Sequence, residues 1–138
     1  MNANRIPWAR IEAVLGDLAG RPFVRGARGP DAFDCWGVVI EARRRLGLPV
    51  PPDFASAALT REDMLALFAT QRPAAWRRAP ELVAGGIVLA RDAGHAGVHV
   101  AGRILHAAAK AGVVTWSLGQ WAAVYGAIEC WTHLEAAP

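Results

Sequence analysis

Hydrophobic side chains recur at helical spacing in the first half of the chain. Over residues 7–19 they return every three or four positions, with Pro7 suited to the first helical position and Gly20 to the stop. The same spacing predicts a second helix over 34–46 and a third over 60–71. The first half of the chain therefore predicts three amphipathic helices joined by loops.

Beyond about residue 84 the pattern changes to short hydrophobic runs separated by glycine or other small residues. Such runs are typical of strands in an antiparallel sheet. They are GGIVLAR (85–91), AGVHVAG (96–102), RILHAA (103–108), GVVTW (112–116) and GAIECWTH (126–133), with a short helix expected over 117–125. Helices followed by strands predict an α+β fold, in which N-terminal helices pack on a C-terminal antiparallel sheet.

Composition narrows the class of protein. The chain has 138 residues, of which 54% are hydrophobic and 20% charged, and this fits one globular domain spanning 1–138. It contains no apolar run of the roughly 18–20 residues that cross a bilayer, and its N-terminus lacks the pattern of a secretory signal. We therefore expect a protein made in the cytoplasm, with no membrane span.

The net charge is +3, and almost all of the positive charges are arginines. These arginines are scattered, and they lack the interleaved aromatic residues of a nucleic-acid platform. We interpret them as a solvated surface and expect no nucleic-acid partner. The two cysteines, Cys35 and Cys130, are too few for a disulfide framework.

Cys35 is the first candidate for chemistry. Asp34 is a favourable N-cap residue, so the cysteine is expected in the first turn of the second helix. Unpaired N–H groups and the positive end of the helix dipole lie there, and both favour the thiolate by lowering the pKa of the thiol. The same N–H groups can stabilise an oxyanion during acyl transfer. A buried structural cysteine is the alternative.

Three of the four histidines lie in a predicted hairpin with its turn at 101–102. Side chains alternate along a strand, so His95, Gly97 and His99 share one face. In this register His106 lies diagonal to both histidines, within side-chain reach, and Gly97 leaves the space between His95 and His106 open. One histidine as the base for a thiol and a second that orients it form a catalytic arrangement. The register leaves open which of His95 and His99 is the base.

A zinc site formed by Cys35, His95 and His99 is the metal-binding alternative. Two histidines four residues apart can share a metal on a helix, whereas on a strand they lie about 13 Å apart. The glycines and valines around them favour a strand. We therefore expect no metal and no other cofactor.

Three motifs resemble those of the NlpC-type cysteine peptidases, in the papain-like superfamily. They are DCWGVV from Asp34, HAGVHV from His95 and RILHA from Arg103. The lead-in GRPFVRGARGPDAFDCWG, the strand AGGIVLAR and the closing strand GAIECW are also similar to this family, so the resemblance covers most of the chain. The phage-tail and gene-transfer-agent branch looks most similar, because its cysteine motif commonly reads Asp-Cys-Trp-Gly.

The resemblance implies a papain-like fold with Cys35 as nucleophile, His95 as base and His106 as the residue that orients the base. The implied reaction is hydrolysis of an amide through a thioester, usually in a peptidoglycan stem peptide between D-γ-glutamate and a diamino acid. The implied setting is a phage-like tail that helps to breach the cell wall. Tail proteins are then the expected partners, and the particle is the final location.

Phe23, Asp34 and Trp36 are the residues expected to contact the substrate. Phe23 stands where many members of the family have a tyrosine whose hydroxyl faces the catalytic centre. Trp36 stands where wall hydrolases commonly have serine, and its indole would reshape the neighbouring subsite unless it is a core residue. These departures keep two alternatives open, a related thiol amidase or acyltransferase and a tail assembly module without the chemistry.

Overall fold

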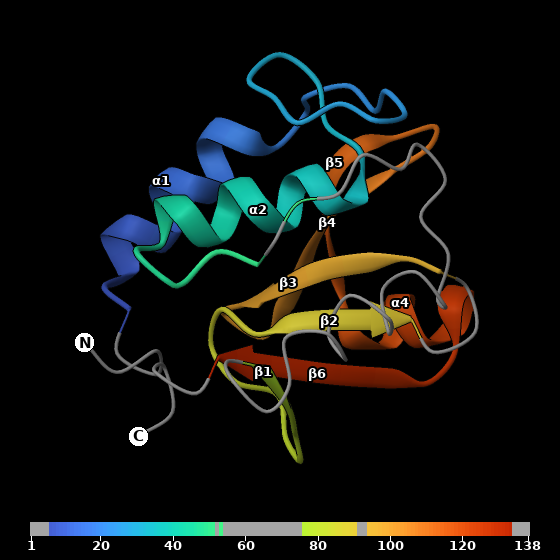
Figure 1. The fold of residues 1–138 in the computed structure, drawn as a ribbon. Helices are drawn as coiled ribbons and strands as arrows, with labels where there is room; N and C mark the ends of the chain where they lie inside the picture. Colours follow the sequence, from blue (N-terminus) through green and yellow to red (C-terminus); the bar gives the residue numbers. More distant parts are fainter. Residues whose placement is uncertain (1–5, 52, 54–75, 91–93, 134–138) are drawn as a thin grey trace.

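Three helices and one sheet are formed by residues 6–51, 53, 76–90 and 94–133, which are the residues that the computed structural model describes (Figure 1). The helices are α1 (Trp8–Leu18), α2 (Cys35–Arg45) and α4 (Leu118–Tyr125). Within these residues no helix is long and apolar enough to cross a bilayer.

The described helices coincide with three of the four predicted ones. Pro7 occupies the N-cap of α1 instead of its first helical position, which moves the start of the helix by one residue. Ser117 caps α4, and its side chain accepts a hydrogen bond from the backbone N–H of Gln120. The helix predicted over 60–71 lies outside the described residues.

The sheet has six antiparallel strands in the order β1-β6-β2-β3-β4-β5. They are β1 (Trp76–Ala79), β2 (Ile87–Ala90), β3 (Ala96–Val100), β4 (Arg103–Ala108), β5 (Gly112–Ser117) and β6 (Ile128–His133). All five predicted strands are present. The sequence pattern misses β1, because Arg77 and Arg78 are both exposed and the strand lacks alternation.

The sheet is covered on both faces. Alternate residues of β2 point in opposite directions. Ile87 packs in the main core together with Val38 of α2, whereas Val88 packs with Trp121 of α4 in a second cluster. Figure 1 shows α1 and α2 together on one side of the sheet. The predicted α+β architecture, with N-terminal helices packed on an antiparallel sheet, is confirmed.

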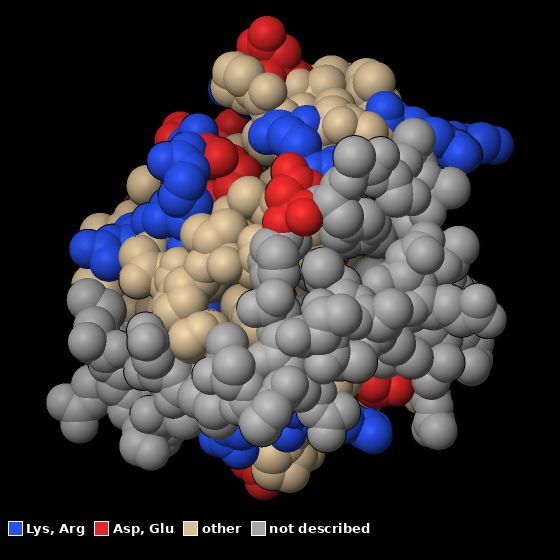
Figure 2. Space-filling model, viewed as in Figure 1, with Lys and Arg blue, Asp and Glu red and all other residues tan. Residues whose placement is uncertain are grey.

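Charged side chains pair along the outer surface of α2. Arg44 and Arg45 both bind Glu41, at 2.5 and 2.6 Å, and Arg45 also reaches Asp17 of α1 at 2.8 Å. Figure 2 shows basic and acidic groups adjoining one another on this face. These arginines therefore belong to a solvated, paired surface.

Arg43, in the same turn, is buried. Its Nε donates to the carbonyl of Pro49 at 2.7 Å and its Nη1 to the carbonyl of Gly85 at 2.5 Å. The guanidinium lies 5.0 Å from the ring centroid of Trp76, which is a cation–π distance. Arg43 thereby ties the end of α2 to the first strand and to the segment before β2.

Candidate active site

Cys35 is the first residue of α2 and lies where the helix meets the start of β3. Asp34 is the N-cap, as predicted, and its Oδ1 accepts a hydrogen bond from the backbone N–H of Gly37 at 2.8 Å. Backbone N–H groups of Ala96 and Trp36 donate toward the Cys35 sulfur. The cysteine is buried, so it sits at the junction between the helical layer and the sheet.

Asp34 also ties the lead-in loop to the helix. Its Oδ2 accepts from the backbone N–H of Gly26 at 3.0 Å, and its Oδ1 accepts from Nη1 of Arg28 at 2.6 Å. Arg28 in turn donates from Nε to Asp53 at 2.9 Å. Asp34 was predicted to contact the substrate, but its carboxylate is buried and these partners are internal. Its observed contacts position the cysteine.

The β3–β4 hairpin brings two histidines into contact. The hairpin turns at 101–102 in the predicted register. A hydrogen bond of 2.9 Å joins Nε2 of His95, directly before β3, and Nδ1 of His106 in β4. His99 instead donates from Nδ1 to the carbonyl of Val83 at 3.0 Å. The structure therefore pairs His95, and not His99, with His106.

Gly97 permits this close approach of the two strands. A Cβ at this position would lie 2.7 Å from Cγ2 of Ile104 and 2.8 Å from the carbonyl oxygen of Leu105. It would also lie 3.1 Å from Cβ of His106. The space beside the second histidine thus accepts only a glycine, in agreement with the role expected for Gly97.

Burial opposes the ionisation of Cys35. Desolvation raises the pKa of the thiol from 9.0 to about 12, and the charge of Asp34 adds to the shift. The N–H groups of Ala96 and Trp36 act in the opposite direction. The sequence predicts a lowered pKa at the start of a helix. The structure gives the opposite direction, because desolvation outweighs the favourable helix end.

Burial also keeps both histidines neutral. It lowers the pKa of His95 to about 3, with the charge of His106 as a second cause. It lowers the pKa of His106 to about 4. At neutral pH the site therefore holds a protonated thiol and two neutral imidazoles. Any transfer of the thiol proton would accompany nucleophilic attack and would not precede it as a stable ion pair.

Aromatic side chains surround the histidine pair, and the sequence pattern does not assign them to a site. Tyr125, the last residue of α4, stacks on His95 with ring centroids 4.5 Å apart, and Trp121 lies 5.2 Å from the same ring. Trp116 of β5 stands edge-on to His106 at 4.4 Å. The available signal was the spacing of four residues between Trp121 and Tyr125, which places both on one side of a helix.

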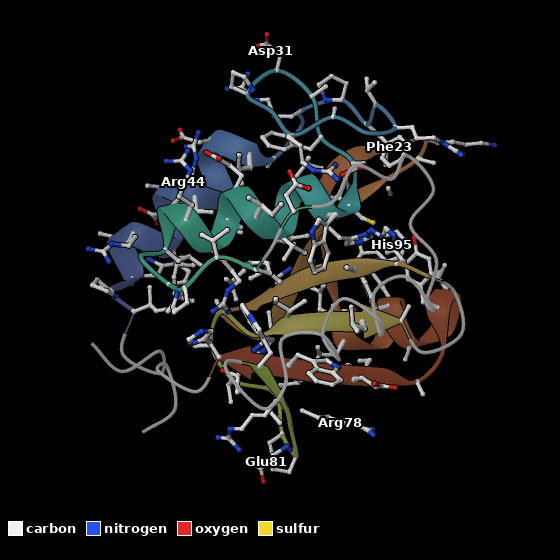
Figure 3. All side chains as sticks on the ribbon, in the orientation of Figure 1. Phe23, Asp31, Arg44, Arg78, Glu81 and His95 are labelled. Carbon is white, nitrogen blue, oxygen red and sulfur yellow. The ribbon has the colours of Figure 1, made fainter. Side chains whose placement is uncertain are left out.

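Phe23 and Trp36 occupy different environments. Trp36 has 0% exposure and lies in the main core, so the structure favours its interpretation as a core residue. Phe23 is half-buried in the lead-in loop and forms a single β-bridge with Phe33. In Figure 3, Phe23 and His95 lie on the same side of the molecule, where α2 begins. Of the two, Phe23 remains a candidate for contact with the substrate.

The zinc alternative required Cys35, His95 and His99 to act together. In the part of the chain that the structure describes, no three His, Cys, Asp or Glu side chains are grouped to hold a metal ion. His95 and His99 have separate partners, His106 and the carbonyl of Val83. Because His95 and His99 have different partners, they are not arranged to bind one metal ion together with Cys35.

Comparisons with known proteins identify the fold. No family model and no curated protein matches the chain. Among solved structures, the NlpC/p60 domain of the peptidoglycan hydrolase SagA is similar, with a TM-score of 0.59 and 18% sequence identity. The match covers 94% of this chain and 98% of that one. This chain therefore has the fold of an NlpC/p60 domain, in agreement with the papain-like fold expected from its motifs.

Proposed function

We propose that this protein is a cysteine peptidase that hydrolyses amide bonds of peptidoglycan stem peptides through a thioester on Cys35. The observation that carries the proposal is the hydrogen bond between Nε2 of His95 and Nδ1 of His106, next to Ala96, whose backbone N–H donates toward the Cys35 sulfur. This bond occupies one nitrogen of His95 and leaves Nδ1 for the thiol proton. The fold adds support, because the similar domain belongs to a peptidoglycan hydrolase.

In the proposed reaction, Sγ of Cys35 attacks the amide carbonyl carbon while Nδ1 of His95 takes the thiol proton. This requires the tautomer in which Nε2–H of His95 donates to His106. The oxyanion forms beside the first turn of α2, where backbone N–H groups can donate to it. His95 then gives the proton to the leaving amine as the C–N bond breaks. Water, deprotonated by His95, hydrolyses the thioester and restores the thiol.

The proposed bond lies between D-γ-glutamate and a diamino acid, and the proposed setting is a phage-like or gene-transfer-agent tail. Both rest on the resemblance of DCWGVV and HAGVHV to the tail branch of the family. Residues 1–138 form one domain in this proposal, with tail proteins as partners and no cofactor. Phe23 borders the substrate site, and Asp34 positions the cysteine.

Purified muropeptides test this function. We expect the wild type to cut them at the D-γ-glutamyl bond, as read by mass spectrometry, and Cys35→Ser to be slower by about a thousandfold or more. Cys130→Ser removes the other buried thiol and is the matched control, with a rate near wild type. Unchanged cleavage by Cys35→Ser contradicts the proposal. Covalent labelling of Cys35 by an acyl probe without muropeptide cleavage indicates a related thiol amidase or acyltransferase.

A tail assembly module without chemistry is the second candidate, and one observation favours it. The pKa of Cys35 is raised to about 12 and both imidazoles are neutral, so the resting site holds no thiolate. Alkylation of Cys35 by iodoacetamide separates the candidates. A peptidase site gives alkylation at neutral pH that falls in His95→Gln. An inactive site gives the slow alkylation of an isolated buried thiol in both proteins.

A further inference from the structure

Two aromatic rings pack against His95. Tyr125 stacks on the imidazole with centroids 4.5 Å apart and planes at 28°, and Trp121 lies 5.2 Å away at 30°. The two aromatic rings are 4.8 Å from each other. The rings of His95, Tyr125 and Trp121 are therefore in mutual contact.

The helix that carries these rings is held in place at its start and at its middle. Side chains of Ser117 and Gln120 cap its start reciprocally, at 3.1 and 2.9 Å. Trp121 is fully buried in the cluster formed with Val88 and Ile104. The position of Tyr125, one turn later, is therefore fixed relative to the sheet and to the histidine.

The proton that His95 accepts creates a cation where little water can reach it. Burial lowers the pKa of this ring, which means that its surroundings disfavour the imidazolium. The negative face of an aromatic ring attracts a cation, and at these centroid distances it replaces part of the lost solvation. Tyr125 and Trp121 are the groups placed to do this on their side of the imidazole.

Building on the proposed function, we propose that Tyr125 is a positioning residue whose ring fixes the plane of His95 and stabilises the imidazolium formed when Cys35 loses its proton. Tyr125 is the single tyrosine of the chain. Burial raises the pKa of the Tyr125 phenol, and the charge of Cys35 is the second cause. The sulfur therefore lies within electrostatic reach of Tyr125. The ring, and not the hydroxyl, carries the effect.

Three variants separate the ring from the hydroxyl. Tyr125→Leu removes the ring, Tyr125→Phe keeps the ring without the hydroxyl, and Val124→Ala is the control on the same helix, at a side chain that is 60% exposed. Tyr125 is half-buried, so these changes leave the core in place. Tyr125→Met replaces Tyr125→Leu if the latter does not fold, as judged by its thermal unfolding.

Two readouts are measured, the kcat and KM on muropeptides and the ratio of the Cys35 alkylation rates at about pH 7 and about pH 10. The ratio reports proton transfer to the histidine, because a change in access of the reagent alters both rates alike. We expect Tyr125→Leu to lower kcat and this ratio about tenfold with little change in KM, from the size of a cation–π interaction. Tyr125→Phe recovers most of the loss, and Val124→Ala behaves as wild type.

Equal alkylation ratios in wild type and Tyr125→Leu overturn the inference. A loss in Tyr125→Phe as large as in Tyr125→Leu also overturns it, because the hydroxyl would then carry the effect. A protein that cuts no muropeptide but shows the expected alkylation ratios supports the role of Tyr125 while contradicting the proposed substrate. The two failures are therefore distinguishable.

Discussion

At the scale of single residues, His95 and His99 differ in their partners although they lie four positions apart. His95 bonds to His106, whereas His99 donates to the carbonyl of Val83. We expect His95→Gln to lower kcat by about 10²–10⁴-fold, since the thiol loses its proposed proton acceptor. His99→Gln keeps kcat near wild type. Steady-state kinetics on muropeptides compare the two variants. An equal loss of kcat in His99→Gln would contradict the assignment of His95 as the base.

The neutral histidine pair makes stability depend on pH. Folding lowers the pKa of His95 and His106 from 6.5 to about 3 and about 4, so below pH 6.5 the unfolded chain takes up protons that the folded state refuses. Once both histidines of the unfolded chain are charged, we expect the free energy of unfolding to decrease by about 2–3 kcal/mol for each unit by which the pH is lowered. Urea unfolding between about pH 5.5 and 4.5 measures the slope. In His106→Gln the slope should halve, and a flat profile in the wild type would contradict burial as the cause.

Cys35 illustrates what a residue-level pattern can predict. The run FDCWG correctly placed the cysteine at the start of a helix behind an N-cap. It gave the wrong direction for the pKa, because the burial of the sulfur arises from packing against β3, far away in the sequence. Helix ends are local features of a sequence, whereas desolvation is a property of the folded assembly.

At the scale of elements, the first turn of α2 depends on Asp34. Its carboxylate accepts hydrogen bonds from Gly37, Gly26 and Arg28. Asp34→Ala should lower the free energy of unfolding by about 2 kcal/mol and lower kcat as well, because the cysteine loses its anchor. Asp34→Asn keeps the cap bond from Gly37 but loses the ion pair and the bond from Gly26, because its amide nitrogen cannot accept a hydrogen bond. Its effect should therefore be smaller than that of Asp34→Ala. Chemical unfolding of both variants checks this order, which an equal loss in the two would contradict.

The last turn of α2 offers a matched pair of arginines. Arg43→Lys should lower the free energy of unfolding by about 3 kcal/mol, since lysine cannot make the same forked contacts with the carbonyls of Pro49 and Gly85. Arg44 has a side chain that is 62% exposed, and Arg44→Lys should cost less than about 1 kcal/mol. Urea unfolding compares them. Similar losses would mean that the buried contacts add no stability.

Most elements could be predicted because their hydrophobic periods are local. The five runs after residue 84 became strands, and the β3–β4 register followed from its turn. β1 could not be predicted, because an edge strand with two adjacent exposed arginines has no alternation. Tyr125 was missed for a related reason. Its stacking on His95 depends on how α4 packs on the sheet, which the spacing within α4 does not determine.

At the scale of the molecule, the candidate site exists only where two layers meet. Cys35 comes from the helical layer, and His95 and His106 come from the sheet, with α4 on its opposite face. The order of the motifs predicted the fold, and the structure shows the same fold as an NlpC/p60 domain at 18% identity. The peptidase activity, the bond that is cut and the particle that carries the protein are proposals, because none of them is encoded in the packing of these layers.

A covalent intermediate on Cys35 is the most direct measurement of the proposed chemistry. Wild type is mixed with a purified muropeptide, quenched in acid within the first turnovers and examined by intact and peptide mass spectrometry. We expect a mass increase equal to the acyl fragment, located on Cys35, and neither this increase nor cleavage in Cys35→Ala. Cleavage by Cys35→Ala at the wild-type rate, with no adduct on the wild-type cysteine, would contradict the proposed peptidase.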